Sequence, residues 1–142
     1  MFGKLFRKKP TPITLDANAP IQKEGFLTEN FGIQIYDGSV APFAKIGNAY
    51  PFEGSCTFTT TEDNQCSIKL SFYRGTDQLA QNCRFLGLYQ LSGFKLAPAE
   101  EPLIRLFFRL KDNKIELWAM DENGRNDILI TLIKNSNGEL VQ

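Results

Sequence analysis

The last third of the chain alternates apolar and polar residues in short runs, and this pattern constrains the fold more than any other feature. In the first run, "IRLFFRL", one face holds Ile104, Leu106, Phe108 and Leu110. A period of two residues is that of a β-strand with one buried face. The segment "KDNK" and an Asn-Gly dipeptide at 123–124 then separate the further runs "KIELWAM" and "DILITLI". Such turn residues between alternating runs are typical of consecutive β-hairpins.

The middle of the chain shows the same kind of pattern. Short strand-like runs, bounded by turn residues, lie around 31–35, 40–45, 55–61, 65–73 and 84–91. The segment "KLAPAEEP" is predicted to be a loop because proline cannot donate the hydrogen bonds of a central strand. After residue 10 the pattern predicts no long helix. About eight short strands spaced by turns predict an all-β fold, a compact antiparallel β-sandwich or a barrel.

The first 24 residues differ from the rest of the chain. They sustain no period of 2 or 3.6 residues, so we expect a flexible, basic, proline-containing tail over 1–24 and one domain over 25–142. Three apolar residues of the tail have the spacing of an amphipathic helix, so contact of residues 1–9 with an anionic membrane stays an alternative. The residues behind these inferences are Phe2, Leu5, Phe6, Pro10, Pro12 and Pro20.

Composition excludes several classes of function. The chain has 16 basic and 16 acidic residues, but four of the basic ones lie in 1–9, so the remainder has a net charge of −4. An acidic domain is not typical of nucleic-acid binding. Histidine is absent, the three cysteines show no metal-ligand spacing, and there is no glycine-rich phosphate loop. We therefore expect no catalytic residues, no cofactor and no metal. The lack of a secretory signal favours a cytoplasmic protein.

Five segments of the chain resemble segments of one known family, in the family's order. "FTTTEDNQCSIKL" is similar to F-S-T-A-x-D-N-Q-x-x-V-x-I in the peptide-binding β-domain of the 70-kilodalton heat-shock chaperones, the DnaK-like family. "FGIQIYDG" resembles L-G-I-E-T-x-G-G, and Tyr50-Pro51 resembles I-P. "FYRGTDQLAQNCRFLGLYQLSG" resembles the segment V-x-Q-G-E-R-x-x-A-x-D-N-x-x-L-G-x-F-x-L-x-G, and "APAEEPLIRLFFRL" resembles A-P-R-G-x-P-x-I-E-V-x-F-D-I. The resemblance covers about residues 29 to 133.

The resemblance implies a chaperone-like module that binds unfolded protein. The family holds an extended peptide in a cleft at one end of the sandwich. Ile68 corresponds to the wall of the family's central pocket, Tyr36 and Thr61 to the two loops that cover the peptide, and Thr59 and Gln65 to backbone contacts. The residues of the implied peptide-binding site are Ile33, Ile35, Tyr36, Phe58, Thr59, Thr61, Gln65, Ile68, Leu70 and Ile104.

Alternation alone favours a core role for the same apolar residues, so both interpretations stay open. The chain also departs from the family: these 142 residues show neither the ATPase domain, nor its leucine-rich linker, nor the helical lid. Ile46 and Asn113 stand where the family has a lysine and an aspartate that contact its ATPase domain, and Ala99-Glu100 replaces Arg-Gly. We therefore expect ATP-independent binding of extended apolar segments and no enzyme activity. The alternative is a degenerate adaptor that binds a dedicated protein partner outside the cleft.

Overall fold

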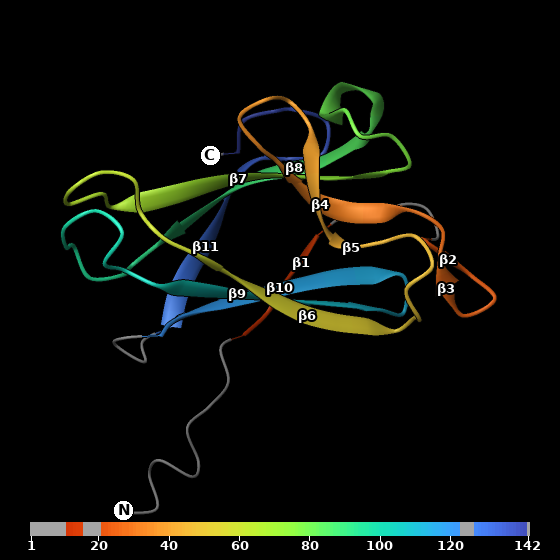
Figure 1. Ribbon diagram of the computed structural model, residues 1–142, viewed down its shortest axis with the longest axis horizontal. Coiled ribbons are helices and arrows are strands. Elements are labelled where there is room, and N and C mark those ends of the chain that lie inside the picture. The colour runs from red at the N-terminus through yellow and green to blue at the C-terminus, as the bar shows by residue number, and fades with distance from the viewer. Residues whose placement is uncertain (1–10, 16–20, 123–126, 142) are drawn as a thin grey trace, which may run out of the picture.

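The computed structural model describes residues 11–15, 21–122 and 127–141, and these consist almost wholly of β-strands (Figure 1). The all-β class predicted from the sequence is confirmed. The strands of the first half are β1 (Ile13–Leu15), β2 (Gln22–Lys23), β3 (Phe26–Leu27), β4 (Asn30–Gln34), β5 (Val40–Ala44) and β6 (Phe52–Phe58). Those of the second half are β7 (Ser67–Gly75), β8 (Arg84–Ser92), β9 (Ile104–Lys111), β10 (Lys114–Asp121) and β11 (Asp127–Lys134), with a 3-10 turn, Ala80–Asn82, before β8.

Eight strands follow one another in a single antiparallel order, β5-β4-β7-β8-β11-β10-β9-β6, which matches the predicted strand number. The sheet curls so that β4, β5, β7 and β8 lie over β6, β9 and β10 (Figure 1). β11 belongs to both layers. Its first two residues pair with β10, and from Leu129 onward it pairs with β8. In the described residues this strand is the one hydrogen-bonded connection between the two layers.

Phenylalanine rings from both layers fill the space between them. The rings of Phe31 and Phe72 are stacked with centroids 5.7 Å apart. Phe43, from the edge strand β5, stacks on Phe108 of β9 at 5.3 Å and so joins the two layers. Aromatic pairs at these distances stabilise a core beyond the apolar area they bury. Because successive side chains of a strand point to opposite faces, every second residue enters this core and the residues between them face outward.

The prediction of a flexible tail up to residue 24 is wrong for the described part of that segment. β1 pairs with β10 in the register Ile13 to Leu117 and Leu15 to Ile115, and Leu15 is 2% exposed. Ile21 is also buried, directly before the short hairpin of β2 and β3. Burial of apolar side chains outweighs the lack of a sustained sequence period here. The inference of membrane contact through residues 1–9 lies outside the described residues.

Two further expectations need adjustment. The strand expected over 55–61 is β6, which ends at Phe58, because Thr59 and Thr60 form hydrogen bonds to the loop before β9 and Thr61 N donates to Gln65 instead of to a strand. The Asn-Gly turn at 123–124 lies outside the described residues, although the strands on either side of it do pair. Within the part of the chain that the structure describes, no helix has the length and apolarity to cross a membrane.

Candidate functional site

The first loop of the candidate site joins β4 to β5 (residues 35–39) and is held by its own hydrogen bonds. Ile35 N donates to the Ser39 carbonyl oxygen, and Gly38 N donates to the Ile35 carbonyl oxygen, both at 2.9 Å. Gly38 has a φ of 87°, a backbone conformation that glycine adopts without steric cost. The Asp37 carboxylate accepts hydrogen bonds from the Ser39 hydroxyl (2.6 Å) and Ser39 N (3.0 Å), which lower the pKa of Asp37. The loop is therefore a defined hairpin whose acid is charged at neutral pH.

The first loop is also fixed from outside by the connection between β7 and β8. Val40 N donates to the Gln78 carbonyl oxygen, and Ala80 N donates to the Gly38 carbonyl oxygen, each at 2.9 Å. This connection supports the hairpin while its tip projects into solvent. Tyr36, at the tip, is 99% exposed. A fully exposed tyrosine on a supported loop is available to contact a partner.

The second loop (residues 59–66) leads from β6 to β7 and is organised by one amide side chain. The Gln65 Oε1 atom accepts hydrogen bonds from Thr61 N at 3.0 Å and Glu62 N at 3.3 Å. Its Nε2 atom donates to the Ser67 carbonyl oxygen at 2.7 Å. The Gln65 side chain therefore shapes the loop itself. Thr61 is exposed at the turn that this amide holds.

The second loop is tied to the loop before β9, and the two lie side by side in Figure 1. Hydrogen bonds between segments about forty residues apart in sequence hold the pair together, and a loop held in this way keeps its shape when a ligand arrives. The bonds run from Thr59 Oγ1 to Pro102 O (2.6 Å), Glu100 N to Thr60 O (3.0 Å), Ala99 N to the Asp63 carboxylate (2.9 Å) and Asn64 N to Ala97 O (2.9 Å).

The second loop leads directly into the start of β7. β4 pairs with β7 from Asn30 opposite Gly75 to Ile33 opposite Phe72, so β4 does not cover the residues of β7 before this point. Ile68 lies on the same face of β7 as the buried Phe72, but it is only half-buried. The apolar side chains on this face of β7 therefore run from the core (Phe72) outward, and the last of them, Ile68, lies where the second loop ends.

The structure divides the ten predicted site residues into three groups. Ile104 is 0% exposed, Leu70 5% and Ile33 8%, so these three belong to the core and support the site from behind. Phe58 and Ile68 are half-buried and pack against that core. Ile35, Tyr36, Thr59 and Thr61 are exposed, and Gln65 is half-buried within its loop.

Sequence reasoning missed one residue that positions the site. Thr60 is fully buried between two exposed threonines, and it accepts hydrogen bonds from Glu100 N through its carbonyl oxygen (3.0 Å) and its hydroxyl (3.3 Å). The run Thr-Thr-Thr gives no local sign of which hydroxyl is buried. The signal lies in the pairing of two distant loops, which a pattern along the chain does not show.

Other polar chemistry is sparse. The described residues contain no group of three or more histidine, cysteine or acidic side chains placed to hold a metal ion. Cys56, Cys66 and Cys83 are all free thiols, and Cys66 is exposed at the end of the second loop. Burial raises the pKa of the Cys56 thiol to about 11, so this cysteine stays protonated at neutral pH. What the site offers is an apolar side chain, backbone groups and hydroxyls.

Comparison with known proteins places this geometry in a family. The family model described as "Hsp70 protein" matches residues 27–140. The chain is 33% identical over 107 residues to the chaperone protein DnaK of Mycoplasmopsis agalactiae and 34% identical over 107 residues to that of Mesomycoplasma hyopneumoniae, in each case 75% of this chain and 18% of the relative. The DnaK of Halobacterium salinarum is 30% identical over 104 residues, which are 72% of this chain and 16% of the relative. The chain thus spans less than a fifth of these relatives, and it belongs to the Hsp70 family.

Proposed function

We propose that this chain binds extended apolar segments of unfolded proteins, and that it does so without nucleotide, in the cytoplasmic setting expected from the sequence. The observation that carries the proposal is the position of Ile68. Its side chain is half-buried at the end of an inward row on β7, beyond the last residue that β4 covers. The second loop, with Thr61 exposed on it, leads into the same end of β7, and the first loop, with Tyr36 exposed at its tip, is held by the connection that follows the other end of β7.

The expected affinity follows from the contacts that such a site offers. Burying one leucine-sized side chain of the peptide contributes about 1.5–3 kcal/mol. Each backbone hydrogen bond adds roughly 0.5–1.5 kcal/mol. Ordering the peptide costs several kcal/mol. The balance predicts a dissociation constant on the order of micromolar or weaker.

Replacing Ile68 by phenylalanine should weaken peptide binding with little loss of stability. A larger side chain at a half-buried position extends outward into the space that a peptide's leucine would take, whereas overpacking a closed core typically costs about 1–3 kcal/mol. The measurements are fluorescence anisotropy of a labelled, leucine-rich extended peptide and thermal unfolding of both proteins.

Leu88→Phe is the matched control, because Leu88 is also half-buried but pairs with Ser71, the neighbour of Leu70, and so lies on the other face of the upper layer from Leu70 and Ile68. It should leave peptide affinity unchanged. A wild-type chain that binds no such peptide at high micromolar concentration contradicts the proposal. So does an Ile68→Phe variant that loses as much stability as an overpacked core.

Adding ATP or ADP should leave the peptide affinity of this chain unchanged. The motifs that resemble the family are those of its β-domain, and the sequence shows no phosphate-binding loop. Anisotropy titrations with and without a millimolar concentration of nucleotide and magnesium test this directly. A shift of the binding curve beyond experimental error would reveal a nucleotide site on these 142 residues.

The adaptor function is the second candidate, and one observation favours it. Three of the six apolar residues that the resemblance assigns to the cleft are core residues, with Ile104 completely buried. A cleft supported in this way could be closed in the resting protein, leaving a dedicated partner to bind another face. The same anisotropy titration separates the two functions, because an adaptor has no affinity for generic leucine-rich peptides.

A further inference from the structure

One edge of β10 is shared by two strands that run in the same direction. β9 pairs along the full length of β10 on one side. On the other side, β11 pairs with β10 only through Asp127 and Ile128, and β1 pairs with it through Ile13–Leu15. From Leu129 onward β11 leaves β10 and joins β8 in the upper layer. The two strands therefore diverge, and we call the space between them the β1–β11 wedge.

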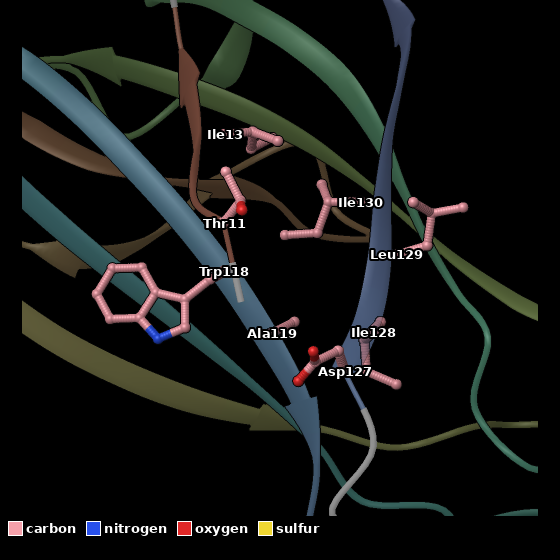
Figure 2. A pocket seen from close by; sticks show the side chains of 8 residues that line it. All are labelled: Thr11, Ile13, Trp118, Ala119, Asp127, Ile128, Leu129 and Ile130. Atoms are coloured by element: carbon pink, nitrogen blue, oxygen red, sulfur yellow. The ribbon is translucent and has the colours of Figure 1, made fainter. Parts of the chain in front are cut away.

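The wedge holds a pocket of about 350 Å³ that is open to solvent on one side. Figure 2 shows Ile13 and Ile130 lying between β1 and β11, and Asp127 close to the point where β10 and β11 part. Most of its walls are apolar, with one carboxylate and one hydroxyl. The lining residues are Thr11, Ile13, Trp118, Ala119, Asp127, Ile128, Leu129 and Ile130.

Beside the cavity, one edge of β11 has a stretch of backbone that pairs with no strand. β8 takes one edge of β11. On the other edge, Lys134 forms a β-bridge with Leu140, and Val141 N donates to the Ile133 carbonyl oxygen at 2.9 Å. Residues 140–141 therefore cover only the C-terminal end of β11. Residues 129–132 pair with no strand on this edge in the described structure. An edge of four residues, about 13 Å long, is a template for one more strand.

The side chains on this edge select the kind of strand. Leu129 is 63% exposed, and Ile130 faces the cavity that Asp127 borders. We propose that the β1–β11 wedge is a second binding site, separate from the loops near Ile68. Its occupant is an extended segment of another protein that pairs with residues 129–132. One apolar side chain of that segment enters the cavity, and a neighbouring lysine or arginine meets the carboxylate of Asp127.

The test uses the chain's single tryptophan, Trp118, which lines the cavity. The probe is a capped hexapeptide, Thr-Lys-Leu-Thr-Leu-Thr, added to the full chain while the tryptophan emission is followed. The emission should change with a saturable curve. An analogue N-methylated on alternate backbone nitrogens cannot pair as a strand and should bind about tenfold more weakly or not at all. Replacing the lysine of the peptide by glutamate should also weaken binding.

Two conservative variants test whether the Asp127 carboxylate contacts the lysine of the peptide. Asp127→Asn should weaken binding of the lysine peptide about two- to fivefold, the range of an exposed ion pair. Asp112→Asn removes the same charge from the distant β9–β10 turn and should change nothing. Equal effects of the two variants, equal binding of the N-methylated peptide, or no emission change at millimolar peptide would each overturn the proposal. A signal that disappears in Ile68→Phe would assign the peptide to the first site and likewise overturn the second.

Discussion

Replacing Leu15 by alanine should lower the free energy of unfolding by about 2–5 kcal/mol, the range for a large-to-small substitution in a core. Leu15 is 2% exposed on β1, opposite Ile115, which is completely buried. The substitution removes apolar burial and leaves a cavity in the core beside β1. Urea unfolding followed by tryptophan fluorescence measures the change, because Trp118 lies in the neighbouring strand.

Thr14→Ala is the control for this prediction. Thr14 pairs with Glu116 in the same short strand but is exposed, so its replacement should change stability by no more than about 0.5 kcal/mol. A Leu15→Ala variant as stable as the control would show that β1 does not contribute to the domain. The predicted difference would instead place residues before the family match within the folded unit.

Replacing Gly32 by alanine should destabilise the protein by about 3 kcal/mol or more, at or above the upper end of overpacking effects. A Cβ atom at Gly32 would overlap the carbonyl oxygen of Ala41 on β5, which is backbone and cannot rotate away. The register of β4 and β5 also shifts between Phe31 and Gly32, so the two strands are already in close approach there. Since β4 leads directly into the first loop, peptide binding should fall together with stability.

Gly47→Ala separates this clash from the general effect of losing a glycine. An added Cβ at Gly47 meets nothing within 4 Å, although its φ of 92° is unfavourable for alanine. The cost there should be about 1–2 kcal/mol. If Gly32→Ala unfolds in urea at the same midpoint as Gly47→Ala, β5 adapts to the added methyl group and the close approach does not constrain the fold.

Sequence patterns predicted the strands well where alternation extends over a long run. β9 and β10 are eight residues each, and their inward residues follow a period of two. β1 could not be found in this way, since three residues among prolines are too few to show a period. Its formation depends on an open edge of β10, which is a property of the folded sheet.

The candidate site shows a different limit. Ile68, Leu70 and Phe72 are equivalent in the alternating pattern, yet their exposure falls along the strand from half-buried to none. Which end of the row opens depends on where β4 stops pairing with β7. Family motifs located the loops, but the alternation treated Ile104 and Ile68 alike. Whether an isoleucine lines the candidate site, as Ile68 does, or supports it from the core, as Ile104 does, depends on the neighbouring strands and not on the residue type.

The double role of β11 has a consequence for how the protein is made. During synthesis, all strands of both layers leave the ribosome before β11 does. Until it arrives, β8 presents an open edge, β10 is open where β1 does not cover it, and no strand pairing within the described residues joins the two layers. Completion thus waits for a late, long-range pairing, a topology that slows folding and prolongs the exposure of strand edges to aggregation. A member of a chaperone family would then depend, in its own biogenesis, on protection of unfinished chains.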